Sequence, residues 1–431
     1  MWSEAAKRYA TPIVNIFSGE NQLAIQLRIE AELAQIQVDF GLVSQEEADL
    51  IRDAIPNVKL SRIEEIESEI HHDIMAMVRA LAEQSGDASG KVHLGATSSD
   101  IKDTVLAIQM VESRILLLKK IDELETVLAD LADKHKTMAC VGRTHGQFAS
   151  PTTVGFKFAN FLYEMYLARE SLVNVPITLS KFSGAVGNYA TVGTTEIENQ
   201  LMAKLGLEAA LISTQVLSRT VHAQYLNSMA VVAGVLERIS KEIRNLQRSE
   251  IREWFEPFSA NQVGSSAMPH KRNPHKSERI SGISRIIRAN ALTGIEDIAL
   301  EHERDITHSS VERIVFPESC NLLYYILDQM IKILSGLTIN EEAISAKLNT
   351  PLMKTEKILL ELVPVVGRQN GHELLRQHVN SDDFKTAVLT DPEILKVLPK
   401  DRLLELFDEV DVGLASEKVE EVITFWKSQR Q

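Results

Sequence analysis

The chain has 431 residues, 44 % of them hydrophobic and 25 % charged, which is the composition of an ordinary folded protein long enough for two or three domains. Its net charge of −14 argues against a general nucleic-acid binder, because such proteins carry an excess of Lys and Arg. No apolar run is long enough to cross a membrane and the N-terminus lacks a signal-peptide pattern, so we expect a cytoplasmic protein without a membrane partner.

Apolar residues recur at helical spacing in three long stretches, residues 117–131, 225–246 and 323–337. The middle stretch repeats the pattern over seven positions, Tyr225, Met229, Val232, Leu236, Ile239, Ile243 and Leu246. Such stripes are typical of long helices packed in a bundle, and we expect the middle helix to run from near Val221 to near Trp254. Strand-like alternation is rare, so the pattern predicts an all-α protein.

The predicted domains follow from where the helical pattern lengthens and shortens. We expect smaller helices in residues 1–96, an elongated bundle of long helices in residues 97–348, and smaller helices again in residues 349–431. Helices as long as the central ones favour packing between subunits, so we expect an oligomer.

The first polar cluster along the chain is His71-His72-Asp73, which we expect inside a continuous helical stretch. Adjacent helical side chains do not share a face, so the two histidines lack the spacing of a zinc site, and we expect no metal. Cys140 and Cys320 are far apart in sequence, and we expect both to be small buried apolar residues.

A second cluster runs from His93 to Asp100 and precedes a long helical stretch. Ser99 or Asp100 is expected to bind the free backbone amides at the start of that helix. The same helix N-terminus, together with Thr97 and Ser98, would suit an anion.

Two further clusters carry the side chains that acid–base chemistry and anion binding require. His145 lies between two glycines, and a histidine in such a segment is a credible proton donor or acceptor near neutral pH. Arg304, Ser309 and Arg313 carry the donors that phosphates or carboxylates need. The alternative for these last residues is a solvated helix face of paired charges.

The most informative segment is Gly264–Pro274, which places two serines beside His270, Lys271 and Arg272. Its prolines argue against a continuous helix, so we expect a loop. A serine held among positive charges can be activated as a base or nucleophile. Taken alone, the segment would fit a solvated basic turn equally well.

This segment resembles the signature loop of the fumarase/aspartase superfamily, Gly-Ser-Ser-x-Met-Pro-x-Lys-x-Asn-Pro, at every fixed position. Nearly the whole chain, from Arg8-Tyr9 to the region past residue 351, resembles the adenylosuccinate lyase family. The most discriminating match is His302–Arg313, and Gln215 falls in a further similar segment. The resemblance implies a fumarase/aspartase-like all-α fold and elimination of fumarate from adenylosuccinate and from succinyl-aminoimidazole carboxamide ribotide. It also implies a homotetramer with active sites shared between subunits, phosphorylated purine or imidazole substrates, and no cofactor.

The resemblance also implies residue roles. Ser265 would be the base, His145 the acid, and Lys271 and Asn273 would stabilise the charge that develops on a substrate carboxylate. The implied substrate-binding residues are Arg8, Tyr9, His71, His72, Asp73, His93, Thr97, Ser98, Gln215, Ser266, Arg272, Glu278, Arg304, Ser309 and Arg313.

The chain departs from the family pattern at two positions, with His71 where arginine is frequent and Glu301 where tryptophan is frequent. The first departure bears on how a substrate phosphate is held. Two other interpretations stay open: another lyase or cycloisomerase of the superfamily, such as argininosuccinate lyase or 3-carboxy-cis,cis-muconate cycloisomerase, and a structural homologue without activity.

Overall fold

The computed structural model describes residues 7–258, 264–268 and 270–430, and helices dominate it, so the predicted all-α class is confirmed. The chain divides into two compact units, each built from three separate stretches. Unit 1 comprises Met1–Asp122, Ala168–Glu237 and Ile280–Gln329; unit 2 comprises Glu123–Leu167, Arg238–Arg279 and Met330–Gln431. The three domains expected from the sequence remain a prediction.

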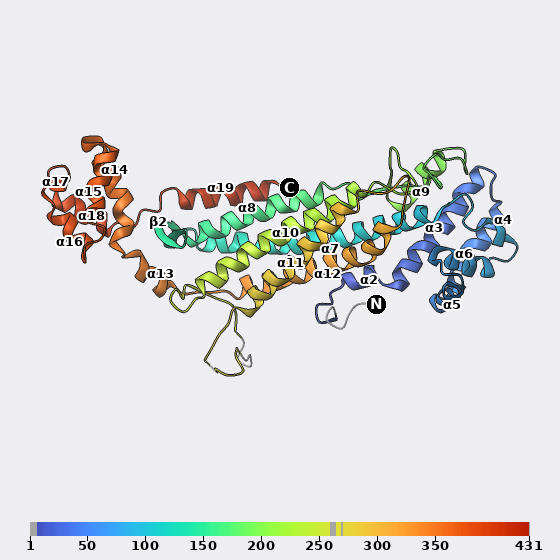
Figure 1. Cartoon of the computed structure of the whole chain (residues 1–431), viewed down its shortest axis with the longest axis horizontal. Coiled ribbons are helices and arrows are strands. Elements are labelled where there is room, and N and C mark those ends of the chain that lie inside the picture. Colours follow the sequence, from blue (N-terminus) through green and yellow to red (C-terminus); the bar gives the residue numbers. More distant parts are fainter. Residues whose placement is uncertain (1–6, 259–263, 269, 431) are drawn as a thin grey trace. The chain divides into compact units, whose positions relative to one another are not determined.

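Unit 1 begins with a group of helices (Figure 1): α2 (Ile13–Ile16), α3 (Gly19–Asp39), α4 (Gln45–Ala54), η1 (Ile55–Asn57), α5 (Leu60–Ile70), α6 (Asp73–Gln84) and η2 (Gly86–Lys91). Local sequence fixes where these helices begin. Ser44 and Glu47 form a reciprocal capping box at the start of α4, and the Ser18 hydroxyl caps α3. The apolar faces meet in one core that includes Ile29 and Met77, both fully buried.

Five long helices each contribute one part to each unit: α7 (Ser98–Lys134), α8 (Val154–Val173), α10 (Arg219–Leu246), α11 (His275–Glu296) and α12 (Thr307–Ser335). A shorter helix, α9 (Glu196–Leu205), belongs to unit 1. All seven apolar positions of the predicted α10 stripe are at most 2 % exposed, so that prediction is confirmed. In unit 1 the stripe meets its neighbours where the hydroxyl of Tyr225 lies 3.0 Å from Ser113 of α7 and its ring stacks on Phe316 of α12.

The expected end of α10 near Trp254 is wrong by eight residues, because the helix ends at Leu246. The carbonyl of Leu246 accepts the amide of Glu253 at 2.8 Å, which folds the chain back instead of continuing the helix. Arg252 has a φ of 57°, a left-handed conformation that a helix interior does not contain. Trp254 therefore lies in a short strand, stacked on Phe158 of α8.

Short strands pair two by two: β1 (Ala139–Thr144) with β2 (Gln147–Thr153), β3 (Leu179–Ser180) with β4 (Glu208–Ala209), and β5 (Trp254–Phe255) with β6 (Thr338–Ile339). The β1–β2 hairpin of unit 2 is antiparallel, with a register shift between Val141 and Arg143. A Cβ on Gly142, inside that shift, would lie 2.5 Å from the carbonyl oxygen of Ser150, so only glycine fits there.

Unit 2 ends in a second group of helices (Figure 1): α13 (Glu341–Leu348), η3 (Pro351–Lys354), α14 (Thr355–Val366), α15 (Arg368–Arg376), α16 (Phe384–Thr390), α17 (Pro392–Leu395), α18 (Lys400–Asp408) and α19 (Ala415–Ser428). Helices α14 to α18 enclose their own apolar cluster around Leu362 and Leu403. The last helix is tied down inside unit 2, where the Trp426 indole donates to the buried carboxylate of Glu125 at 3.0 Å.

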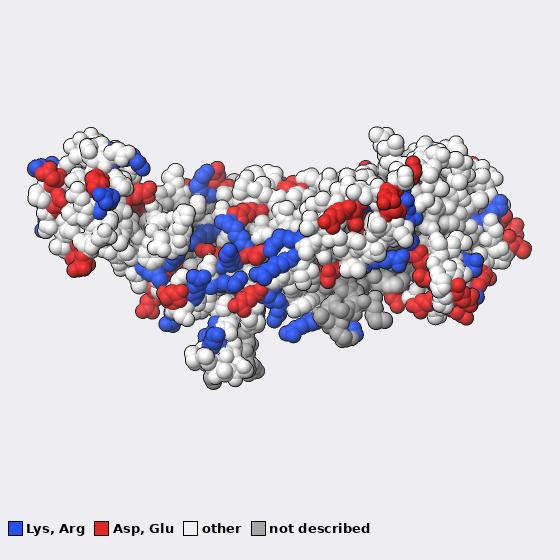
Figure 2. Space-filling view, in the orientation of Figure 1, with Lys and Arg blue, Asp and Glu red and all other residues white. Residues whose placement is uncertain are grey.

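Charge is unevenly spread over the molecule. In the view of Figure 2, acidic side chains gather over the N-terminal helices, whereas Lys and Arg gather over the long helices. Both cysteines are buried and unpaired, as predicted. None of the described helices could cross a membrane, and the described part of the chain contains no His, Cys, Asp and Glu group arranged to hold a metal ion.

Candidate active site

The first cluster of unit 1 does not lie inside a continuous helix, which corrects the prediction. Helix α5 ends at Ile70, and His71 follows it in the left-handed region with φ 56°. His72 then caps α6, because its Nδ1 accepts the amide of Met75 at 3.2 Å. Because the His72 ring accepts a free amide at the start of α6, a new helix begins at Asp73 instead of α5 continuing. His71 and His72, between the two helices, are both exposed.

Asp73, the first residue of α6, connects the first cluster to two other segments of unit 1. Its Oδ2 lies 2.8 Å from Nζ of Lys102 on α7 and 2.6 Å from Nη2 of Arg313 on α12. Burial would raise the pKa of Asp73, but the hydrogen bond from Lys102 and the charges of Lys102 and Arg313 lower it overall. The carboxylate is therefore ionised and holds both cations beside it.

His93 of the second cluster is also held by a carboxylate. Glu30 accepts the His93 amide at 3.0 Å and lies 2.6 Å from its Nδ1, and the Glu30 side chain is only 1 % exposed. Burial would lower the pKa of His93, but Glu30 raises it overall. The φ of His93 is 63°, which lies in the left-handed region that few residues other than glycine adopt. The two contacts with Glu30 hold His93 in that conformation.

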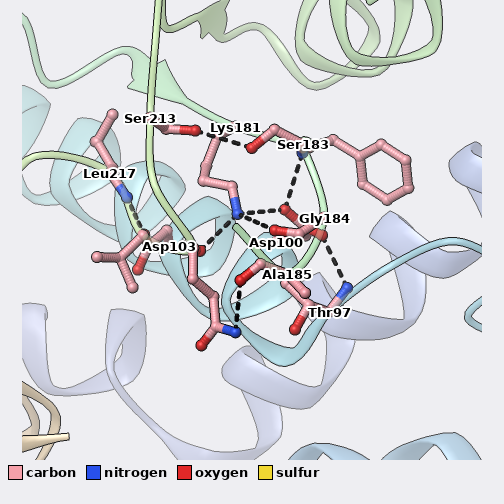
Figure 3. A network of polar contacts seen from close by, with 12 residues as sticks. Thr97, Asp100, Asp103, Lys181, Ser183, Gly184, Ala185, Ser213 and Leu217 are labelled. Atoms are coloured by element: carbon pink, nitrogen blue, oxygen red, sulfur yellow. Dashed lines mark hydrogen bonds and ion pairs between the residues drawn. The ribbon is translucent and has the colours of Figure 1, made fainter. Parts of the chain in front are cut away.

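A buried ion pair organises the rest of the second cluster (Figure 3). Lys181 and Asp100 have fully buried side chains 2.7 Å apart, and Asp100 also accepts the amides of Thr97 and Ser183. The prediction that Ser99 or Asp100 is the N-cap is wrong, because α7 begins at Ser98 and both residues lie inside its first turn. Asp100 instead reaches back and accepts the amide of Thr97, the residue before the helix, at 2.8 Å. Ser98 is the first residue of α7 and is half-buried.

The same lysine fixes Gln215, and Gln215 fixes Arg304. Lys181 donates to the Gln215 backbone carbonyl at 2.5 Å, while the Gln215 side-chain oxygen accepts Nη1 of Arg304 at 2.8 Å. The side-chain amide nitrogen of Gln215 donates to the backbone carbonyl of Ala185 at 2.9 Å. Two predicted binding residues that are 89 positions apart are therefore in direct contact.

A second buried network lies behind the start of α12. Arg219 makes a bidentate ion pair with Asp103, at 2.9 and 3.0 Å, and also contacts Glu312. The Glu312 carboxylate lies 2.5 Å from Nδ1 of the buried His222. Burial would raise the pKa of Asp103, but Arg219 lowers it to about 2. These contacts anchor the helix turn that carries the predicted anion-binding residues.

Ser309 and Arg313 are four positions apart on α12 and therefore share a face. Both line a pocket of about 230 Å³ in unit 1 that Asp73 and Lys102 also line. Tyr9 contacts another part of α12, where its carbonyl accepts the side-chain amide of Asn321 at 3.1 Å, whereas Arg8 is exposed. The Tyr9 ring lies 5.0 Å from that of Tyr325, about three helix turns beyond Arg313.

The predicted acid, His145, lies at the tip of the β1–β2 hairpin in unit 2. Its φ of 53° and the 77° of Gly146 give the two central residues the positive φ of a type I′ turn. Close to this tip, Arg143 forms an ion pair with Glu253, which is 1 % exposed. His145 itself is exposed at this turn.

The signature loop, also in unit 2, is closed on itself around Ser265; its Pro269 lies outside the described residues. The Ser265 hydroxyl oxygen accepts the amides of Ala267 and Met268 at 3.3 and 3.1 Å. Asn273 donates from its side chain to the Gly264 carbonyl at 3.0 Å. A Cβ on Gly264 would lie 1.9 Å from the Lys271 carbonyl oxygen, so the loop closes only with glycine there.

A hollow of about 1120 Å³ lies beside this loop within unit 2. Its lining includes seven basic side chains, Lys241, Arg244, Arg248, Arg252, His270, Lys271 and Arg272. Two acids also line it: Glu278 in the first turn of α11, and Glu256, which accepts the Ser277 amide at 2.6 Å. Such a surface suits a small anion. Ser266 is exposed on the loop and Asn273 half-buried.

Unit 1 thus brings together Asp73 and Arg313, and Gln215 and Arg304, whereas Ser265, Lys271 and His145 belong to unit 2. Sequence reasoning missed the residues that hold these side chains in place: Glu30, Asp103, Lys181, Arg219 and Glu253. No local motif marks them. Their sequence neighbours are a mixture of polar and apolar residues, so the sequence carries no signal that marks them or names their partners.

Comparison with known proteins identifies the family. Residues 7–288 match the family model described as "Lyase". An adenylosuccinate lyase of Pyrococcus abyssi is 42 % identical over 424 residues, covering 95 % of this chain and 94 % of the relative. A solved fumarate lyase of Mesorhizobium sp. BNC1 has a TM-score of 0.88 at 26 % identity, covering 96 % of this chain and 98 % of its own. A 3-carboxy-cis,cis-muconate lactonizing enzyme of Pseudomonas putida has a TM-score of 0.85 at 26 % identity, covering 96 % and 97 %.

The solved structures share the fold with this chain, whereas the much higher identity lies with the adenylosuccinate lyase. The resemblance first suggested by the signature loop is therefore confirmed over nearly the whole length. The chain belongs to the adenylosuccinate lyase family of the fumarase/aspartase superfamily.

Proposed function

We propose that this chain cleaves adenylosuccinate to AMP and fumarate by anti β-elimination, and that it cleaves succinyl-aminoimidazole carboxamide ribotide in the same way during purine nucleotide synthesis. The proposal rests on two features that this chain combines, a serine loop and an anion-binding helix face. A serine loop with two amides on its hydroxyl oxygen would supply the base, and Ser309 and Arg313 on one face of α12 would bind a phosphate.

Ser265 would remove the proton beside a substrate carboxylate. A free serine hydroxyl is a weak base, and it must be held as an alkoxide to act. The amides of Ala267 and Met268 point at its oxygen and would stabilise that negative charge, since hydrogen bonds to a charged form favour it. Lys271 and Arg272 in the same loop add positive charge.

His145 would protonate the departing nitrogen, and Lys271 with Asn273 would hold the carboxylate whose charge grows as the carbanion forms. The side-chain amide of Asn273 already donates to the Gly264 carbonyl, which fixes it inside the loop. Most of the rate enhancement would come from positioning and electrostatics, because the chemistry consists of two proton transfers and one bond cleavage.

The predicted binding residues would hold the rest of the substrate. Arg304, fixed by Gln215, and Arg313, fixed by Asp73, offer guanidinium donors for carboxylate or phosphate oxygens. The remaining proposed binding residues are Arg8, Tyr9, His71, His72, Asp73, His93, Thr97, Ser98, Ser266, Arg272, Glu278 and Ser309.

We further propose a cytoplasmic homotetramer in which each active site takes residues from different subunits. Large apolar side chains of the long helices are exposed in the single chain, among them Val231, Leu292 and Ile314 at 50 to 63 %. Exposed apolar surface of this kind is typical of subunit contacts. Mixing inactive Ser265→Ala and His145→Ala proteins after mild denaturation should restore part of the activity. Hybrid tetramers without activity would contradict shared sites.

The substrate is tested by offering adenylosuccinate, argininosuccinate and 3-carboxy-cis,cis-muconate side by side and following the ultraviolet absorbance. We expect only adenylosuccinate to be consumed, with AMP and fumarate as products. Turnover of another substrate alone would support the alternative superfamily members, and turnover of none would favour a structural homologue without activity.

A further inference from the structure

Lys102 lies beside the proposed substrate-binding residues of unit 1 but belongs to none of the polar clusters in the sequence. It is in the second turn of α7, five residues beyond Thr97, and its side chain is about one-quarter exposed. Its ammonium group lies 2.8 Å from Oδ2 of Asp73, the same oxygen that Arg313 contacts at 2.6 Å. Two cations from different helices therefore converge on one atom.

We propose that Lys102 is a substrate-binding residue that acts with Arg313 and Ser309 on the phosphate of the nucleotide. This inference rests on the proposed function, because it assigns a place to the substrate phosphate. Lys102 would supply a point charge, Arg313 a planar fork and Ser309 a hydroxyl donor, a combination that matches the oxygens of a phosphate dianion.

The pocket supports this assignment by its lining. Lys102, Arg313, Ser309 and Asp73 all line the pocket of about 230 Å³. The remaining acid there, Glu312, is already engaged by Arg219 and His222. Two cations facing one ionised carboxylate leave a net positive charge for an incoming anion.

Asp73 explains how two cations remain side by side without the ligand. Each is within hydrogen-bond distance of its carboxylate, so the mutual repulsion of Lys102 and Arg313 is offset. Lys102 also places an ammonium group close to the first cluster, where this chain has the exposed His71.

The test compares ligands with and without the phosphate by isothermal titration calorimetry of the full chain. AMP, inorganic phosphate and adenosine are titrated into the wild-type protein and into Lys102→Met, Lys102→Arg and Lys119→Met. Lys119 is an exposed lysine on the same helix and serves as the matched control. Circular dichroism checks the fold, and Lys102→Gln replaces Lys102→Met if the latter does not fold.

A lost charge-assisted hydrogen bond predicts that Lys102→Met weakens AMP and phosphate binding by about 10- to 100-fold. Adenosine binding should be unchanged, Lys102→Arg should restore most of the affinity for AMP, and Lys119→Met should behave as the wild type. Equal weakening of AMP and adenosine, or unchanged binding of AMP and phosphate, would overturn the proposal.

The proposed function is read separately from the turnover of adenylosuccinate by the wild-type chain. Normal turnover with AMP binding that ignores Lys102 would refute the role of Lys102 and leave the activity standing. An inactive wild type that loses AMP and phosphate affinity with Lys102→Met would refute the activity and leave the anion site standing.

Discussion

Replacing Lys181 by Met should destabilise unit 1 strongly, because it leaves a carboxylate buried without its cation. Both Lys181 and Asp100 have fully buried side chains, and their 2.7 Å ion pair is the centre of the network in Figure 3. Methionine retains the volume of the lysine stem and removes only the ammonium group. Breaking a buried pair in this way costs about 3–5 kcal/mol, a large part of the stability of a typical domain.

The loss is measured by guanidinium unfolding followed by circular dichroism at one fixed protein concentration, since an oligomer's stability depends on concentration. Lys204→Met, at an exposed lysine of α9 in the same unit, is the matched control and should change the free energy of unfolding by less than about 0.5 kcal/mol.

The double variant Asp100→Asn/Lys181→Met should lose less than the sum of the two single variants, because each single change removes the same ion pair. Lys181 also holds the Gln215 carbonyl, so the KM for adenylosuccinate should rise as well. A loss for Lys181→Met no larger than that of Lys204→Met, or strictly additive single changes, would refute the view that this pair organises the site.

Two further predictions concern His145, the proposed acid at the hairpin tip, and Asp297, the residue that follows α11. His145→Asn should lower kcat by about 100-fold or more, because asparagine cannot donate the proton to the leaving nitrogen. The free energy of unfolding should change little, because asparagine tolerates the positive φ at this position. Near-normal turnover would exclude His145 as the acid. Burial and the charge of Glu312 raise the pKa of Asp297 to about 6, so its ionisation at higher pH disfavours the folded state. Asp297→Asn should therefore stabilise the protein at pH 7.5 relative to wild type, with a smaller gain at about pH 5 in the same unfolding assay. An equal gain at both pH values would contradict the raised pKa.

Much of the fold could be predicted from periodicity. The α10 stripe from Tyr225 to Leu246 is buried as expected, because an apolar face repeating every three to four residues must be removed from water. The end of that helix could not be predicted in the same way. It depends on the Glu253 amide bonding to Leu246, and on the pairing of Trp254 with Ile339, which is 85 residues away.

The predicted site residues came from motifs, and motifs record what a side chain can do but not what holds it. Arg304 and Gln215 were both named, yet their contact depends on Lys181. The apolar spacing of Ile74, Met77 and Val78 predicts that His71-His72 lies inside a helix. The pattern could not show that a histidine ring caps α6. Long-range polar contacts of this kind leave no periodic trace in a sequence.

The most direct test of the proposed chemistry is to measure fumarate release from adenylosuccinate by the wild-type chain and by Ser265→Ala, together with adenylosuccinate binding to both. If Ser265 is the base, the wild type should release fumarate and AMP in equal amounts. The variant should bind the substrate with a similar Kd while its kcat falls by about 10²- to 10⁴-fold or more. A Ser265→Ala protein that keeps a kcat within about tenfold of wild type would place the base on another residue and contradict the mechanism.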